Sequence, residues 1–510
     1  MFKSTLCLLG LATSLVASTT NETEKCPPAI TIDKKPQIFV LTDITNEPDD
    51  SMSLVRLLLH SDQYNITGIV ATTSYWLNST VRPEAILNTT NVWDQVLDKL
   101  NLHSDGEFPT KAYLESIVKA GHPVYGTDVF KEKTLSEGAK HLIDVVDDLP
   151  KDEILHVGGW GGVQTLAEAL KYVRSTRKPQ QTDEFVSKLR LYTISDQDNA
   201  GPWIRINFPR LHYIASIHGF NVYQEATWTG FSGGVGSDTS LTNQEYSTKN
   251  FQIGPLGPYY PDIRYSMEGD TPTFLHTMVN GINGGPEDHP EWGGWGGRYD
   301  LVDPSRQTLQ YANTEDTVLG IDNKTHTTTQ ATIWRWRQAY QDEMSARVQW
   351  TIQSNYSSGS HPPVVSVNNS CGSNHISYTV SPLETVTLSG ASTYDPDEGL
   401  SGHSNGLEYS WWQYKEPSAT MDTGVQHIPT LNFTLSEGGK VASVQMPSAE
   451  EACIPVQADA NVGLGIQKTC QQYHVIFEVR GSGEPPIRRY KRVILKVRSP
   501  LLDEDYEEEI

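Results

Sequence analysis

The chain carries little positive charge, and beyond its first residues it lacks a long apolar run. Lys and Arg number 39 against 62 Asp and Glu, which gives a formal net charge of −23. This balance disfavours a polyanion such as nucleic acid as partner and suits a cation or a neutral sugar better. No stretch after the amino terminus is long and uncharged enough to span a bilayer. We therefore expect neither a nucleic-acid partner nor a membrane partner.

The first residues have the layout of a cleaved secretory signal. A basic Lys3 precedes an apolar run from Leu6 to Val16 and a small-residue site at Val16-Ala17-Ser18. This layout predicts a signal peptide over residues 1–18 and a secreted, extracellular mature protein. Sequons agree with export and predict glycosylation at Asn21, Asn65, Asn78, Asn88, Asn323, Asn355, Asn368 and Asn432.

Cysteine is scarce, with 5 residues in the chain. Once Cys7 leaves with the signal, the even number that remains suits disulfides in an oxidising compartment. None of these has C-x-x-C spacing, so a zinc site is not expected. Cys453 and Cys470 flank a short segment, and we predict that they pair. Cys26 and Cys371 would then form the second disulfide.

At 510 residues the chain is too long for one ordinary core, and its pattern changes in its last third. Residues 36–352 alternate short apolar strands with amphipathic stretches, which predicts an α/β domain with a mostly parallel sheet and helices on both faces. Residues 353–363 are rich in Ser, Gly and Pro and predict a linker. In residues 364–499, short segments of alternating apolar and polar residues are separated by turns, which is typical of an all-β immunoglobulin-like sandwich. Residues 500–510 form an acidic tail.

An apolar strand over residues 37–42 ends in a cluster of carboxylates. Pro48 marks the start of a helix, with Asp49 and Asp50 in its first turn, and a second apolar strand follows. Strand, helix and strand form the crossover of a parallel sheet, and such sheets bind ligands at the carboxyl ends of their strands. Asp43, Asp49 and Asp50 therefore predict either a site with the hard oxygens that Ca²⁺ requires or a helix start that favours acidic residues.

Two later loops hold candidate sugar-binding side chains. Asp196 and Asp198 follow a predicted strand over residues 189–194, where paired carboxylates suit sugar hydroxyls and a helix-capping turn is the alternative. Trp295 and Arg298 lie in a glycine-rich loop whose indoles could stack on a sugar ring. Packing between the two domains is the alternative for that loop. The first interpretation of each loop predicts a carbohydrate-type ligand.

The segment from Asp43 to Asp50 resembles the D-x-D-x-x-x-D-D opening of the nucleoside hydrolases, which cleave the N-glycosidic bond of ribonucleosides with a calcium ion. The chain is more similar still to a branch that joins a nucleoside-hydrolase-like domain to a C-terminal β domain and is described as cellulose-binding. This resemblance spans nearly the whole mature chain. It also rests on the segments Trp160-Gly161-Gly162, Ser195-Asp196-Gln197-Asp198, Trp295-Gly296-Gly297-Arg298-Tyr299 and Trp411-Trp412-Gln413-Tyr414.

The resemblance implies a role for each motif residue. It makes Asp50 a calcium ligand and Asp49 the carboxylate that holds a sugar hydroxyl. Asp43 would be a further calcium ligand. Thr45 stands where the family has its general base, which leaves Asp43 as the motif carboxylate able to take that role.

Two further residues complete the calcium site that the resemblance implies. Residues 158–170 resemble the family's G-P-L-T-N-L-A segment, which places the backbone carbonyl of Gln164 at a calcium-ligating position. Asp288-His289 resembles a late His-Asp pair of the family with its order reversed, and would make Asp288 a further ligand. Calcium is therefore the expected cofactor.

Two hypotheses for function remain open. Under the first, the protein is a hydrolase of N-glycosyl compounds that acts on a glycosidic or carbohydrate ligand at an acidic, calcium-binding pocket. Under the second, it is a non-catalytic cellulose-binding or polysaccharide-binding protein that retains the hydrolase scaffold. The retained Asp49 and Asp50 favour the enzyme, whereas Thr45 favours the binding protein. The expected partner is a carbohydrate, polysaccharide or nucleoside ligand.

Overall fold

The computed structural model of the 510-residue chain describes residues 26–27, 35–104, 107–283, 289–400, 406–419, 424–453, 455–456, 467–468 and 470–498. The predicted signal peptide over residues 1–18, the sequon at Asn21, the candidate ligand Asp288 and the acidic tail lie outside the described residues. Among the described residues, no helix combines the length and the apolar character that crossing a membrane requires.

The first domain is built on an eight-stranded sheet with the order β3-β2-β1-β4-β5-β6-β8-β7. Every neighbouring pair is parallel except β7 with β8, which confirms the predicted, mostly parallel sheet. The strands are β1 Gln37–Thr42, β2 Asn65–Ala71, β3 Val118–Ala120, β4 Leu155–Gly159, β5 Leu189–Thr193, β6 His212–Ala215, β7 Tyr299–Leu301 and β8 Gln310–Asn313. A separate hairpin pairs β9 Asp316–Leu319 with β10 Thr325–Thr328.

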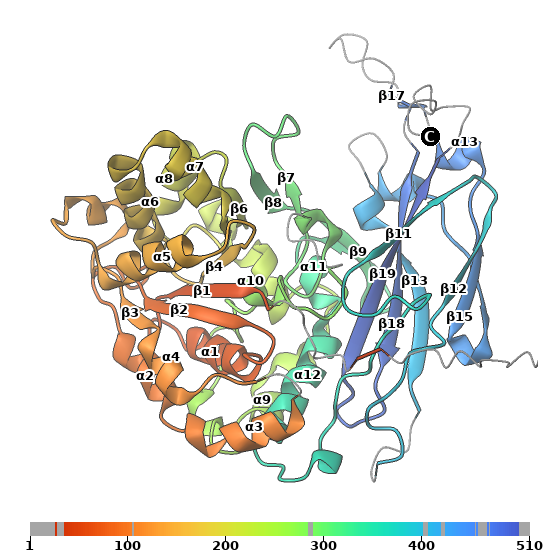
Figure 1. Ribbon diagram of the computed structural model, residues 1–510, viewed down its shortest axis with the longest axis horizontal. Helices are drawn as coiled ribbons and strands as arrows, with labels where there is room; N and C mark the ends of the chain where they lie inside the picture. The colour runs from red at the N-terminus through yellow and green to blue at the C-terminus, as the bar shows by residue number, and fades with distance from the viewer. Residues whose placement is uncertain are drawn as a thin grey trace, which may run out of the picture.

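Helices cover both faces of this sheet, as the sequence predicts (Figure 1). Side chains alternate along β1, so that Ile38 and Val40 belong to one buried cluster with α1, whereas Phe39 and Leu41 belong to another with α5 and α6. The helices are α1 Asp49–Leu59, α2 Pro83–Thr90, α3 Leu97–His103, α4 Lys111–Ser116, α5 Glu137–Asp148, α6 Gln164–Thr176, α7 Pro179–Ser187, α8 Ala200–Asn207, α9 Gln244–Asn250, α10 Pro272–Leu275, α11 Ala331–Trp334, α12 Arg337–Trp350 and, in the second domain, α13 Ala449–Ala452.

The second domain consists of two main sheets around one buried cluster. One sheet has the order β11-β19-β18-β13 and the other the order β12-β15-β14. The predicted antiparallel pattern fails at one edge, because β11 runs parallel to β19. The strands are β11 Ile376–Val380, β12 Thr385–Ser389, β13 Glu408–Tyr414, β14 Phe433–Ser436, β15 Val441–Gln445, β18 Gln472–Arg480 and β19 Arg488–Val497, with a small hairpin of β16 Pro455–Val456 and β17 Gln467–Lys468.

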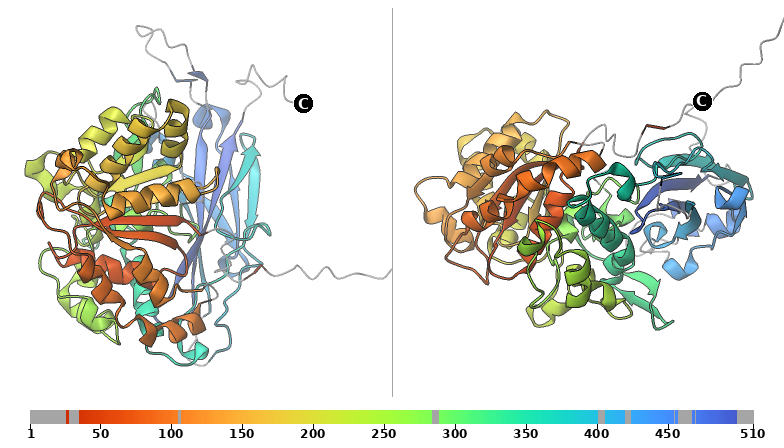
Figure 2. Two further views of the ribbon diagram at one scale, coloured as in Figure 1. Left: turned by 60° about the vertical axis from the view of Figure 1, so that its left-hand side comes forward. Right: turned by 90° about the horizontal axis from the view of Figure 1, so that it is seen from below.

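The two domains pack closely, with α11 and α12 between the large sheet and the second domain (Figures 1 and 2). The buried cluster around α1 and α12 continues into the second domain through Tyr414, Ile476 and Tyr490. The segment predicted as a linker takes part in this packing, because Ser360 and His361 are buried. The first domain and the β-rich second domain therefore share a continuous apolar interior.

Two disulfides fix the chain. Cys453 pairs with Cys470, which confirms the predicted bond. Cys26 pairs with Cys371, with Cα atoms 5.6 Å apart, so that the amino-terminal residues are joined to the second domain. Both bonds agree with the oxidising compartment that the cysteine content predicts.

Candidate functional site

The carboxyl ends of the parallel strands bring the predicted acidic residues to one edge of the sheet. Asp43 follows β1 directly, and Asp49 and Asp50 open α1. Asp270 reaches the same place from far along the chain, two residues before α10. The site therefore combines the local motif of Asp43, Asp49 and Asp50 with Asp270, which lies outside that motif.

Asp49, Asp50 and Asp270 form the centre of the site. Each offers one carboxylate oxygen, and these three oxygens all lie within 4.8 Å of one another. All three side chains are buried. Thr42, the last residue of β1, donates its hydroxyl hydrogen to Oδ1 of Asp50 and so holds one of the carboxylates. Such a group of hard oxygens is the kind of donor set that binds a hard divalent cation.

The three carboxyl groups stand in an unfavourable electrostatic environment. Burial, followed by the charges of Glu47 and Asp43, raises the pKa of Asp49 to about 7. Burial and the neighbouring carboxylates also raise the pKa values of Asp50 and Asp270 well above the ordinary range. A cation among these oxygens would replace repulsion with attraction.

Asp270 supplies a second indication that the group suits a cation. Its Oδ2 is buried and has no hydrogen-bond partner among the described residues. A buried oxygen left without a partner costs about 1–3 kcal/mol, so a native structure needs a reason to keep one. The donor chemistry of Asp49, Asp50 and Asp270 fits Ca²⁺ or a similar hard ion.

Asp43 lies beside this group and is held separately. Its Oδ2 accepts a hydrogen bond of 2.5 Å from the Ser74 hydroxyl. A Cβ atom on Gly161 would lie 2.7 Å from Oδ1 of Asp43, so only glycine allows this close approach. Burial is the largest cause that raises the pKa of Asp43, to about 6. The carboxyl group therefore sits in the range that suits a general base near neutral pH.

The two other motif residues of interest, Thr45 and Glu47, differ in their exposure to solvent. Thr45, at the family's general-base position, is exposed and has a left-handed backbone with φ 83°. Glu47 is half-buried, and its charge contributes to the raised pKa values of Asp43, Asp49 and Asp50. The sequence analysis did not predict Glu47 as part of the site. Its position between Asp43 and Asp49 was the signal that could have identified it.

Asp198 and Gln164 connect two neighbouring loops of the site. Oδ2 of Asp198 accepts the backbone N–H of Gln164, the first residue of α6, at 3.1 Å. Oδ1 accepts the N–H groups of Ala200 and Gly201 at the start of α8, so the helix-capping alternative describes this carboxylate. Burial raises the pKa of Asp198 to about 7.

Asp196 is engaged in an ion pair. Its two carboxylate oxygens accept hydrogen bonds of 2.8 and 2.6 Å from the guanidinium of Arg205, in the last turn of α8. A bidentate pair of this kind fixes both side chains in one geometry. Any sugar hydroxyl would have to compete with Arg205 for this carboxylate.

Trp295 and Arg298 take part in domain packing, the alternative for their loop. Trp295 is 0% exposed, with its ring edge-on to the rings of Tyr340 and Tyr490. Arg298 is buried and bonds Oδ1 of Asp316 at 2.7 Å. Buried side chains of this kind cannot stack on a ligand at the surface, so the structure does not place these two residues at a sugar site.

Asp270 is the member of the carboxylate group that the sequence did not predict. It lies in the string Gly269-Asp270-Thr271-Pro272, where proline marks the start of α10. An acidic residue just before a helix start was the only local signal. A Cβ atom on Gly269 would lie 2.7 Å from Oδ2 of Asp49. The absence of a side chain therefore allows the backbone at Gly269 to approach the site closely.

Comparisons with known proteins agree with this architecture. The family described as "Cellulose-binding Sde182, nucleoside hydrolase-like domain" matches residues 37–299, and "Cellulose-binding protein Sde0182, C-terminal domain" matches residues 385–497. A search of curated proteins finds no match.

Among solved structures, a nucleoside hydrolase-related hypothetical protein from Saccharophagus degradans, associated with carbohydrate metabolism, matches with 30% identity and a TM-score of 0.71. The match covers 91% of this chain and 100% of that chain. Human CDH23 EC21-23 matches at 15% identity and a TM-score of 0.16, over 27% of this chain and 33% of that chain. The chain therefore belongs to the cellulose-binding Sde182 family, with a nucleoside-hydrolase-like first domain and a Sde0182 C-terminal domain.

Proposed function

We propose that this protein binds a carbohydrate ligand at the acidic site, with a calcium ion held by Asp49, Asp50 and Asp270. The observation that carries the proposal is the group of three buried carboxylate oxygens within 4.8 Å of one another, with Oδ2 of Asp270 lacking a hydrogen-bond partner among the described residues. The family is described as cellulose-binding, which supports a glucan as the ligand class. When bound, the ion would supply positive charge to orient sugar hydroxyls.

Calcium titration by calorimetry tests the ion site. We expect the wild-type protein to bind Ca²⁺, and the variants Asp50→Asn and Asp270→Asn to bind at least tenfold more weakly, since each loses a charged ligand. Asp128→Asn is the matched control, because Asp128 is an exposed carboxylate paired with Lys131. Equal binding by all four proteins would contradict the calcium site.

N-glycosyl hydrolysis is the second candidate function, and Asp43 carries it. Its pKa is raised to about 6, chiefly by burial, which suits a group that takes a proton from an attacking water. In this reaction the water oxygen bonds to the anomeric carbon and its proton passes to Asp43. The bond to the leaving nitrogen breaks with its electron pair staying on the nitrogen, which takes a proton from solvent. Turnover of inosine or uridine that Asp43→Asn abolishes would support the enzyme. Absent turnover, with calcium binding intact, would leave the binding function.

We further propose that the mature protein is secreted and glycosylated, and that its second domain is an immunoglobulin-like sandwich. The oxidised cysteines support export. The asparagine of every sequon within the described residues is exposed, as glycan attachment requires; these residues are Asn65, Asn78, Asn88, Asn323, Asn355, Asn368 and Asn432. A mass shift on enzymatic deglycosylation of the secreted protein tests this proposal.

A further inference from the structure

Four aromatic side chains gather at the edge of the sheet where the acidic site lies. We call Tyr75, Trp76, Phe220 and Tyr223 the aromatic patch. Three of them are unusually open to solvent, with Tyr75 51%, Trp76 47% and Phe220 59% exposed. Tyr75 and Trp76 follow β2, and Phe220 and Tyr223 form part of a 3-10 helix after β6.

The rings of the aromatic patch contact one another and form one surface. The ring centroids of Tyr75 and Trp76 are 5.0 Å apart, and those of Tyr75 and Phe220 are 5.4 Å apart. Trp76 and Phe220 lie nearly parallel, with an interplanar angle of 23°. Single exposed aromatic residues are ordinary, whereas a contiguous exposed group marks a binding surface.

The aromatic patch is joined to the acidic site through Ser74. The Ser74 hydroxyl donates to Oδ2 of Asp43 and also accepts the backbone N–H groups of Trp76 and Leu77, both at 3.0 Å. One hydroxyl therefore fixes the start of the aromatic patch relative to a carboxylate of the site. A rigid connection of this kind gives the two surfaces a constant spacing.

A second path connects the aromatic patch to the carboxylates through Trp228. The ring of Trp228 lies 5.8 Å from that of Tyr223. A Cβ atom on Gly269 would lie 2.8 Å from the Trp228 ring and 2.7 Å from Oδ2 of Asp49, so ring and carboxylate meet across this glycine. The indole N–H of Trp228 donates to Ser195, which holds the ring in place. Aromatic rings thus run from the exposed patch through the buried Trp228 to the carboxylates.

We infer that the aromatic patch binds the pyranose rings of a β-linked glucan chain whose hydroxyls reach the acidic site. This inference rests on the proposed carbohydrate-binding function and names where the chain lies. A β-linked glucose unit carries its hydroxyls around its rim and C–H groups on both faces. Aromatic rings suit the faces and carboxylates suit the rim, and here the two surfaces adjoin.

Binding of cellotetraose, measured by calorimetry in calcium-containing buffer, tests the inference. We expect Trp76→Ala and Phe220→Ala each to weaken binding about three- to tenfold, the effect of one aromatic contact. Trp76→Phe should retain most of the affinity, because it keeps a ring. Tyr172→Ala is the matched control, since Tyr172 on α6 is exposed to a similar degree, 43%, and should bind like the wild type. Unchanged melting temperatures show that the variants fold.

The outcomes separate the aromatic patch from the acidic site. Unchanged affinity in Trp76→Ala and Phe220→Ala, with loss of binding in Asp49→Asn, would overturn the aromatic patch and leave the proposed function standing. Loss in the aromatic variants with none in Asp49→Asn would support the aromatic patch and contradict the acidic site. Absence of cellotetraose binding by the wild type overturns both. Adenosine binding that depends on Trp76, without cellotetraose binding, would also overturn the glucan.

Discussion

Thr45 adopts a backbone conformation that its side chain disfavours. Its φ of 83° lies in the left-handed region, where β-branched residues are strained. We expect Thr45→Gly to stabilise the protein by about 1 kcal/mol, because glycine removes a strain that outweighs its greater freedom in the unfolded chain. Denaturant unfolding measures the change. A lower unfolding midpoint for Thr45→Gly would show that Thr45 makes contacts that offset its strain.

Thr45→Asp tests whether Thr45 occupies the general-base position of the motif. Aspartate tolerates left-handed backbone better than threonine, so the substitution should not destabilise the fold. If Thr45 occupies the general-base position, the new carboxylate should raise any N-glycosidase rate by about 10²–10⁴-fold. Initial rates with inosine and uridine, compared between Thr45→Asp and Thr45→Asn, measure the gain, since asparagine matches the size of aspartate without its charge. Equal rates for both variants would remove Thr45 from the base position.

At the residue scale, the sequence predicted the carboxylates of one motif and missed the distant one. Asp49 and Asp50 were recognisable because a strand and a helix start flank them. Asp270 is more than 200 positions away, and no local spacing connects it to Asp50. The candidate chosen in its place, Asp288, lies outside the described residues. Long-range geometry of this kind is set by the packing of α10 and not by any local pattern.

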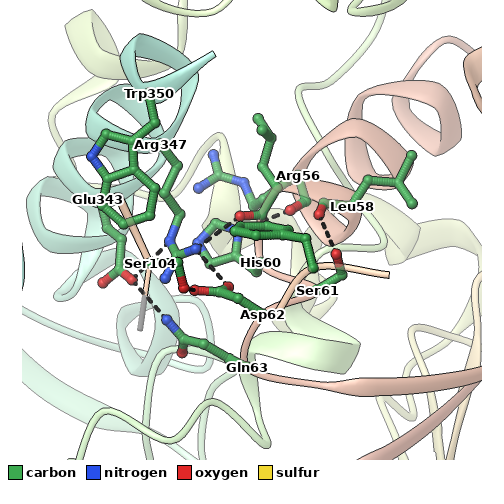
Figure 3. A network of polar contacts seen from close by, with 12 residues as sticks. Arg56, Leu58, His60, Ser61, Asp62, Gln63, Ser104, Glu343, Arg347 and Trp350 are labelled. Carbon is green, nitrogen blue, oxygen red and sulfur yellow. Dashed lines mark hydrogen bonds and ion pairs between the residues drawn. The ribbon is translucent and has the colours of Figure 1, made fainter. Parts of the chain in front are cut away.

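At the scale of elements, α12 is tied to β19 by a buried ionic contact. Glu343 of α12 accepts hydrogen bonds from Arg489 of β19 at 2.7 and 3.1 Å and from Arg347 at 3.2 Å. Arg347 also bonds Asp62 at 2.7 Å, and Figure 3 shows it between the two acidic residues. The contact therefore links three segments that are distant in sequence.

We expect Glu343→Gln to destabilise the protein by about 3–5 kcal/mol, because it leaves the buried guanidinium of Arg489 without its counter-charge. Glu408→Gln is the control, since Glu408 is 65% exposed, so that its pair with Arg480 should contribute less than about 1 kcal/mol. Chemical denaturation of both variants measures the difference. Similar losses would show that the network is not specific to the interface between α12 and β19.

The same carboxylate predicts a loss of stability in acid. Burial alone would raise the pKa of Glu343, but the charges of Arg489 and Arg347 outweigh burial and lower it to about 2, from an ordinary 4.5. A lowered native pKa means that the stabilisation is present above about pH 4.5 and is lost as the pH falls through about 2. Unfolding free energies between pH 5 and pH 2 should therefore fall more steeply in the wild type than in Glu343→Gln. Parallel curves would contradict this assignment.

Elements with a strong pattern were predictable, and irregular ones were not. The apolar run that became β1 was recognised because burial on both faces of a parallel sheet favours continuous hydrophobic residues. The spacing of apolar residues over 332–351 indicates one helix, but the structure divides this segment into α11 and α12, where Trp336 leaves helical geometry with φ −99° and ψ 1°. That break depends on tertiary packing of the indole, which helical periodicity does not reveal.

At the scale of the whole molecule, hydrogen bonds cross the buried contact between the two domains. Arg492 of β19 donates to the backbone carbonyls of Ile282, Trp292 and Gly293 in the first domain. The Tyr414 hydroxyl donates to Oδ2 of Asp316 at 2.7 Å. Neither domain could expose these groups without losing hydrogen bonds inside an apolar interface.

We therefore expect a single calorimetric unfolding transition for the full chain, with calcium raising its midpoint. Binding at the first domain should stabilise the second domain as well, because the shared interior unfolds cooperatively. Differential scanning calorimetry with calcium and with EDTA makes the test. Two transitions, of which calcium shifts only one, would show that the interface does not couple the domains.

The bond between Cys26 and Cys371 encloses the whole first domain in a covalent ring. A protease that cuts once between α12 and Cys371 would open this ring without releasing either part. The two pieces would separate on a gel only after reduction, and the nicked protein would keep its domains at high effective concentration. In an environment rich in secreted proteases, the crosslink thus keeps the two domains joined after a single cut between them.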